Sequence, residues 1–151
     1  MRDIVIKFLQ NNYFNQLDTE FDFYTNSQNS EYFIVSQYSS NELHNFFDDD
    51  KTSQVIKEFE RLSLKSEHEN IKKNTSLFIL VEVDNLKEAF EDDKIQKSIL
   101  LIEEDYYYFR KFVLLYTLKG ISDLQDKSTN DVLYSYLESN IKNFEENMFF
   151  S

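Results

Sequence analysis

Three short runs of apolar residues predict the strands of a small sheet. Residues 31–38 combine aromatic and β-branched side chains, the types that favour strands. Residues 76–83 and 98–103 are almost continuously apolar, a pattern typical of strands that are buried on both faces. The hydrophobic pattern therefore predicts a sheet of about three strands.

Apolar residues at helical spacing lie before and between these runs. They predict helices at residues 4–9, at 52–62 and around 86–90. Ser39 and Glu42 lie three positions apart, as in a capping box, and predict a further helix directly after the first strand.

The segment after residue 103 predicts a longer helix. Phe109, Phe112, Val113 and Tyr116 follow the i, i+3, i+4, i+7 spacing of one helix face, and Gly120 is placed to end the helix.

A second apolar stripe predicts a helical C-terminus over residues 128–148. Its members recur at helical spacing: Leu133, Tyr136, Leu137, Ile141, Phe144 and Met148. A length of 151 residues suits one domain. We therefore expect residues 1–151 to form a single α+β domain, with helices packed on a small sheet.

Composition excludes several classes of function. The 28 Asp and Glu residues against 16 Lys and Arg give a formal net charge of −12. This charge repels nucleic-acid phosphates, so direct nucleic-acid binding by this chain alone is disfavoured. The chain has no Cys, which excludes disulfides and thiol chemistry, and its single Gly excludes the glycine-rich loops that bind nucleotide phosphates.

The beginning of the chain lacks the pattern of a signal peptide. No apolar run approaches the roughly 20 residues that a membrane-spanning helix needs. We therefore expect a cytoplasmic protein that makes no membrane contact.

Few residues suggest catalysis or metal binding. His44 and His68 lie far apart in the sequence, and no motif marks a nucleophile near either. Glu82 and Asp84 could offer carboxylate oxygens to a divalent cation, but acidic runs such as 103–105 are also typical of helix starts. We expect no catalytic residue, no cofactor and no metal site, and hence no enzyme.

The densest feature of the sequence is the run from Tyr106 to Lys111, in which aromatic residues precede an Arg and a Lys. Tyr and Arg are enriched at the energetic centres of protein–protein interfaces. We interpret this segment as a partner surface, with Phe109 toward the core and Arg110 outward. Packing within the domain is the alternative interpretation.

Residues 98–117 resemble a known family. The strand ending in Glu103-Glu104-Asp105, the aromatic run after it and the Phe109-Arg110-Lys111 core look like the middle component of bacterial three-component ABC-ATPase (Lamassu-like) defence systems. The resemblance implies a non-catalytic adaptor that links an SMC-like ABC ATPase to an effector protein, often a nuclease, in an anti-phage or anti-plasmid complex. The partner interface that it implies is Glu103, Glu104, Asp105, Tyr106, Tyr107, Arg110 and Lys111.

The charge leaves a second function open. A small acidic immunity or inhibitor protein, such as a nucleic-acid mimic, would use its negative charge to bind a basic enzyme.

Overall fold

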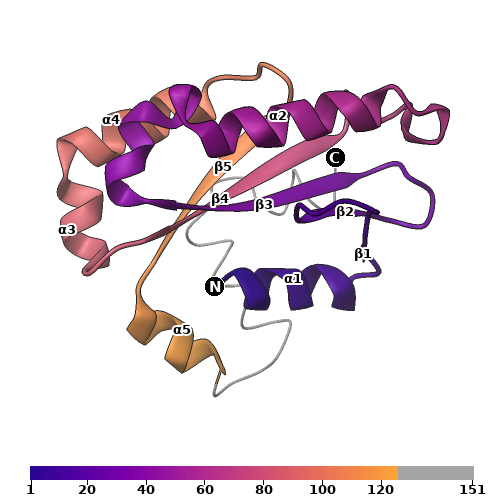
Figure 1. Ribbon diagram of the computed structural model, residues 1–151. Coiled ribbons are helices and arrows are strands. Elements are labelled where there is room, and N and C mark those ends of the chain that lie inside the picture. Colours follow the sequence, from indigo (N-terminus) through magenta and orange to yellow (C-terminus); the bar gives the residue numbers. More distant parts are fainter. Residues whose placement is uncertain (126–151) are drawn as a thin grey trace.

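A mixed β-sheet forms the centre of the fold. The structure is a computed structural model in which residues 1–125 are described. These residues form a five-stranded sheet in the order β1-β2-β3-β4-β5 (Figure 1). The pairs β1·β2 and β2·β3 are antiparallel, whereas β3·β4 and β4·β5 are parallel. The strands are β1 (Asn15–Gln16), β2 (Phe23–Thr25), β3 (Tyr32–Ser39), β4 (Thr75–Glu82) and β5 (Arg110–Tyr116).

Helices cover both faces of this sheet. In Figure 1, α2, α3 and α4 lie on one side, and α1 and α5 lie on the other. Both connections between the parallel strands therefore place their helices on the same side. The helices are α1 (Arg2–Asn11), α2 (Asp50–Ser63), α3 (Leu86–Glu91), α4 (Asp93–Glu103) and α5 (Leu118–Gln125), with the 3-10 helices η1 (Ser40–Asp48) and η2 (Ser66–His68).

Successive residues of β3 belong to two different cores. Tyr32 and Ile34 pack in the cluster that contains Phe59 of α2, whereas Phe33 packs in the cluster that contains Leu9 of α1. Burying a large apolar side chain contributes about 1.5–3 kcal/mol relative to leaving it exposed. Because both faces are covered, the central strands can be apolar at nearly every position.

The sequence correctly predicted α1, β3, α2, β4 and α3. The expectation that acidic residues 103–105 start a helix is wrong, because Glu103 is the last residue of α4 and a strand follows. Other acidic residues do start helices. Asp49 caps α2 by accepting a hydrogen bond from the Lys51 amide, and Asp92 caps α4 in the same way. The capping box of Ser39 and Glu42 is present at the start of η1.

The prediction of a strand at residues 98–103 is wrong, because these residues form the second half of α4. Only Ile102 of this run is fully buried, and Leu100 and Leu101 are each 56% exposed. Periodicity cannot separate a short apolar run in a helix from a buried strand. The cap at Asp92 starts the helix, and α4 then continues through the apolar run.

The prediction of a helix that follows residue 103 and ends at Gly120 is also wrong, because residues 110–116 form β5. Seven consecutive residues of β4, from Ser76 to Glu82, pair with this strand. A strand with apolar residues on both faces matches helical spacing by chance, which explains the error. Gly120 lies inside α5 and does not end a helix.

The predicted count of about three strands is too low, since β1 and β2 were not foreseen. The predicted helix over 128–148, and with it the helical C-terminus, lies outside the described residues.

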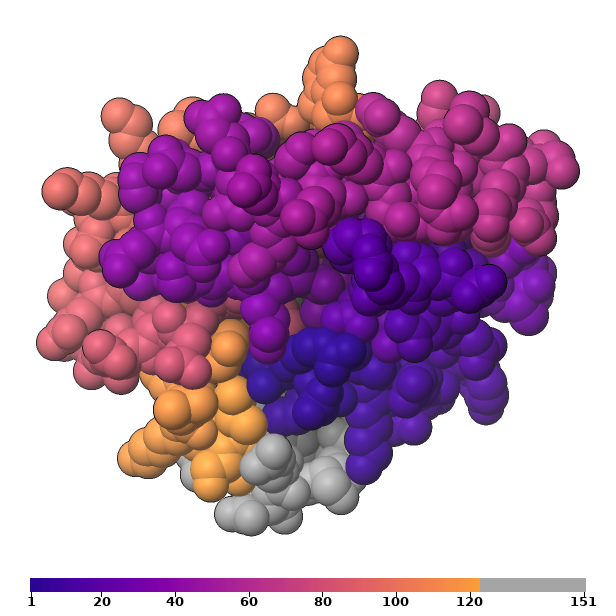
Figure 2. All heavy atoms as spheres, in the orientation of Figure 1, coloured from indigo at the N-terminus to yellow at the C-terminus, as the bar shows by residue number. Residues whose placement is uncertain are grey.

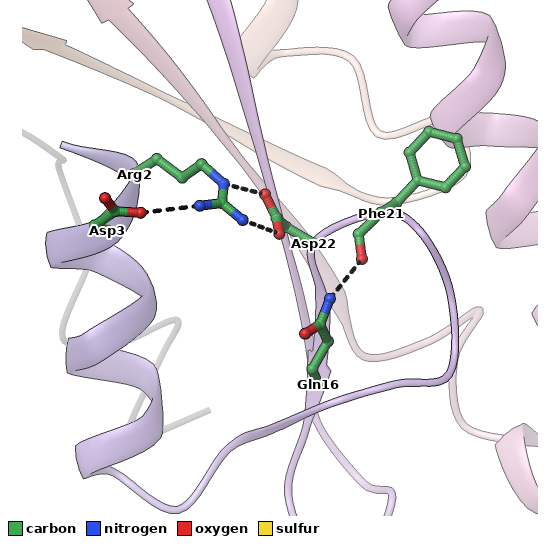
Figure 3. A network of polar contacts seen from close by, with 5 residues as sticks. All are labelled: Arg2, Asp3, Gln16, Phe21 and Asp22. Carbon is green, nitrogen blue, oxygen red and sulfur yellow. Dashed lines mark hydrogen bonds and ion pairs between the residues drawn. The ribbon is translucent and has the colours of Figure 1, made fainter.

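A two-pronged ion pair links α1 to the segment before β2 (Figure 3). Arg2 Nε and Nη2 donate to the two carboxylate oxygens of Asp22 at 2.6 and 2.7 Å, and Nη1 contacts Asp3 at 2.9 Å. Asp22 raises the pKa of Arg2, chiefly through this hydrogen bonding. Gln16 donates to the carbonyl of Phe21 across the β1–β2 turn at 3.3 Å. These contacts attach α1 to the antiparallel end of the sheet.

Candidate protein-binding site

The connection between α4 and β5 carries the tyrosines that the sequence singled out. We call residues 104–109 the tyrosine loop. Tyr106 and Tyr107 are 75% and 74% exposed. In Figure 2 the segment with the orange colour of residues near 105 projects above the body of the molecule. Adjacent exposed tyrosines offer large, amphipathic surfaces of the kind enriched at protein interfaces.

Lys111 holds this loop from inside the domain. Its Nζ donates to the carbonyl oxygens of Asp105, Tyr107 and Phe109 at 3.0, 2.9 and 3.1 Å. It also pairs with Asp105 Oδ1 at 3.0 Å, and its side chain is only 3% exposed. Burial lowers the pKa of Lys111, and the bond to Asp105 opposes that shift. The sequence predicted Lys111 in the partner interface; the structure gives its ammonium group internal partners instead.

Two local features fix the course of the tyrosine loop. Asp105 Oδ1 accepts a hydrogen bond from the Tyr107 amide at 2.9 Å, and the Phe109 amide donates to the Tyr107 carbonyl at 2.9 Å. Tyr108 has a φ of 69°, a left-handed conformation that costs a non-glycine residue on the order of 1 kcal/mol. Burial works against the charge of Asp105, but bonds from Lys111 and the Tyr107 amide lower its pKa.

Aromatic contacts join the loop to the core. The ring of Phe109 lies 5.2 Å from that of Phe59 in α2, and the ring of Tyr108 lies 6.4 Å from Phe59. Tyr107 contacts Tyr108 edge-on, with 5.0 Å between ring centroids. Phe109 is buried, as the sequence predicted. The exposed end of the loop is therefore tied to the buried core through a continuous set of rings.

The acidic residues before the loop have different surroundings. Glu103 Oε2 accepts a hydrogen bond from the Val113 amide of β5 at 2.9 Å, and burial raises the pKa of Glu103 despite this bond. Glu104 is exposed to solvent. Glu103 thus supports the edge of the sheet, whereas Glu104 is available at the surface.

Arg110 lies on the other face of the sheet from Lys111. Its neighbours in β5 alternate between the two cores, and Phe112 packs with the α1 side. Burial raises the pKa of Glu31, and the charge of Arg110 partly offsets this shift. Arg110 is half-buried, so it is less exposed than the sequence predicted.

Two apolar side chains beside the loop were missed by the sequence analysis. Leu100 and Leu101 are exposed at the last turn of α4, directly before the loop. They were assigned to a buried strand, so their exposure could not be expected. Correct placement of the cap at Asp92 is the signal that would have revealed it.

The residues considered for catalysis lie elsewhere. His68 is buried, its Nδ1 lies 2.8 Å from the Tyr32 hydroxyl, and burial lowers its pKa. His44 is exposed on η1. Within residues 1–125 no group of three or more His, Cys, Asp or Glu side chains is arranged to hold a metal ion.

Glu82 and Asp84 lie at the carboxyl end of β4. They line an open depression of about 470 Å³ together with Lys87, Thr117 and Lys119. Glu82 is exposed there and its charge contributes to the raised pKa of Tyr116, for which burial is the main cause.

Among residues 1–125, no helix is long and apolar enough to cross a membrane. A search of curated proteins returned no match. A search of solved structures returned none either.

A protein-family comparison matches residues 31–145 to the family described as "ABC-three component (ABC-3C) system Middle Component 1". The match begins just before β3 and includes all three parallel strands and the tyrosine loop. It covers well over half of the chain and confirms the resemblance seen in residues 98–117. The chain therefore belongs to the family of middle components of ABC-three component systems.

Proposed function

We propose that this chain is a non-catalytic adaptor that links an SMC-like ABC ATPase to an effector protein, often a nuclease, in an anti-phage or anti-plasmid complex. The family is a component of a multi-protein system, which implies protein partners. The observation that carries the proposal is the tyrosine loop, which exposes Tyr106 and Tyr107 within the region that defines the family.

The contacts of the loop suit a binding surface. Lys111 and Glu103, whose pKa values burial shifts, direct their hydrogen bonds to backbone groups of this chain. Lys111 therefore supports the shape of the loop, and Glu103 supports the strand that follows it. The exposed tyrosines can then contact another protein without losing interactions in the core.

Co-purification tests the adaptor function. The full chain is co-expressed with the ATPase and the effector that we expect its neighbouring genes to encode, and a tag on one partner is used for capture. We expect one assembly that contains all three proteins, and we expect the ATPase and effector to separate when the chain is omitted. Recovery of an ATPase–effector complex without the chain would contradict a linking role.

The alternative is a small acidic immunity or inhibitor protein that binds a basic enzyme. The net charge of −12 favours it, because such charge accelerates association with a basic cleft. Strongly salt-dependent inhibition of one basic nuclease, with no assembly with an ATPase, would support this alternative over the adaptor.

A further inference from the structure

We propose that the tyrosine loop is a preformed docking site for arginine side chains on a partner protein. The identity of that partner as a member of the same complex rests on the proposed function. The expected binding of arginine does not rest on that function, because we infer it from the exposed groups of the loop.

The loop is fixed before any partner binds. Lys111 bonds to three of its carbonyl oxygens, Asp105 bonds to the Tyr107 amide, and Tyr108 contacts Phe59. Binding therefore requires little ordering of the backbone, and ordering is one of the main costs of association.

The exposed groups of the loop favour a cation. The face of a tyrosine ring is electron-rich and attracts guanidinium groups. Glu104, two positions before Tyr106 in the loop, adds an exposed carboxylate. Lys111, one of the two cations that follow the tyrosines in the sequence, does not compete, because it is buried and paired with Asp105.

Arginine fits better than lysine because of the surroundings of the rings. Its planar guanidinium can stack on an aromatic face and donate to a carboxylate at the same time. Leu100 and Leu101, exposed directly before the loop, can cover the aliphatic part of a long side chain. Arg110 lies on the other face of the sheet and leaves the site without a repelling charge.

Single-stranded nucleic acid could also stack on tyrosines. Here its phosphates would meet Glu104 and a chain of net charge −12. The observations therefore favour a protein partner, and nucleic-acid binding becomes an outcome that the experiment can detect.

The first experiment titrates the full chain with a hexa-arginine peptide and follows the tyrosine ring signals by NMR. A hexaglutamate peptide and a short oligo-thymidine strand are titrated in parallel. We expect saturable shifts of the Tyr106 and Tyr107 rings with the arginine peptide only. Shifts with the oligo-thymidine strand, or arginine binding that leaves both rings unshifted, would overturn the proposal.

Matched variants separate the rings from general charge attraction. In the double variant Tyr106→Leu/Tyr107→Leu, which keeps the net charge, we expect peptide affinity to fall about tenfold. The variant Tyr106→Phe/Tyr107→Phe keeps the aromatic faces and should stay within about twofold. Tyr13→Leu is the control, because Tyr13 is 84% exposed but follows α1 at the other face of the sheet. Equal affinity of the double leucine variant and Tyr13→Leu would contradict the proposal.

The same variants in the co-purified complex distinguish this inference from the proposed function. If the native chain joins ATPase and effector but the double leucine variant does so equally well, the docking site is refuted and the adaptor function stands. If the native chain joins neither, while the arginine peptide still binds through both rings, the adaptor function fails and the chemistry of the site stands.

Discussion

The two connections between the parallel strands share one architecture but differ in what they expose. The first, residues 40–74, ends in a buried polar pair, in which His68 meets the hydroxyl of Tyr32. The second, residues 83–109, is held by buried Lys111 of β5, which pairs with the partly exposed Asp105, but it leaves Tyr106 and Tyr107 in solvent. In each connection a polar contact thus holds the segment that leads back into the sheet. We call the contact of His68 with Tyr32 the first anchor and the contacts of Lys111 the second anchor. Only the second connection also exposes side chains that could bind a partner.

The two connections indicate that different residues contribute to stability and to partner binding. Removing one partner of such a polar contact is costly in either connection, because the groups left behind lose their hydrogen bonds. Exposed rings contribute little to folding. We therefore expect substitutions at the two anchors to change mainly stability, and substitutions at the exposed rings to change mainly assembly.

The largest effect is expected at the second anchor. Lys111→Met keeps most of the side-chain volume but leaves three carbonyl groups and Asp105 without the ammonium group. We expect a loss of about 2–4 kcal/mol in the free energy of unfolding, measured in urea. Faster hydrogen exchange of the Tyr107 amide should accompany it. Lys57→Met, at an exposed position of α2, is the control and should change stability by less than about 0.5 kcal/mol.

At the first anchor, His68→Leu should cost about 1–2 kcal/mol at neutral pH, because the Tyr32 hydroxyl loses its partner. It should leave partner binding unchanged. Assembly that weakens as much as in Lys111→Met would contradict the division between the two connections.

Replacing His68 should also change how the free energy of unfolding depends on pH. Burial lowers the pKa of His68, with Glu67 opposing and Lys65 adding to the shift. The unfolded chain therefore binds more protons below the ordinary value of 6.5, and native stability falls as pH drops through and below that value. The stability difference between the native chain and His68→Leu should shrink on acidification. A constant difference from pH 7.5 to about pH 5 would show that His68 does not titrate differently on folding.

A smaller effect is expected at Arg110. Arg110→Glu places a second carboxylate near Glu31, whose pKa burial already raises. We expect a loss of about 1 kcal/mol, reduced when Glu31→Gln is added. Equal losses with and without Glu31→Gln would mean that the two side chains do not interact. Co-purification of this variant tests separately whether Arg110 belongs to the partner interface that the family resemblance implies.

The smallest effect on stability is expected at the exposed rings. Tyr106→Leu/Tyr107→Leu should change the free energy of unfolding by less than about 0.5 kcal/mol, because both side chains are mostly in solvent. Its effect on assembly should nevertheless exceed that of His68→Leu. A large loss of stability would show that these two rings contribute to the packing of the core. It would contradict the proposed difference between the two connections.

Much of the fold could be predicted because its signals are local. Strand β3 is rich in aromatic and β-branched residues, helix α2 has helical periodicity, and the capping box of Ser39 and Glu42 identifies the start of η1. The errors fall on α4 and β5, where apolar runs are compatible with either structure. There the choice depends on whether β4 has a free edge to pair with, which no local pattern reports.

The same holds for the candidate site. The sequence identified the aromatic run and the acidic residues before it, and hence a family and a surface. It could not show that Lys111 turns inward, because a lysine is ordinarily a surface residue and its burial depends on three carbonyl groups that the loop brings together.

The sequence by itself determined that the chain is acidic, rich in tyrosine and phenylalanine, and equipped with the apolar runs of an α+β domain. Tertiary structure decided which apolar run became a strand, because pairing with β4 satisfies backbone groups that a helix would have satisfied internally. It also decided which of the neighbouring tyrosines face solvent, since that depends on the contacts that Phe59 and Lys111 make with the loop.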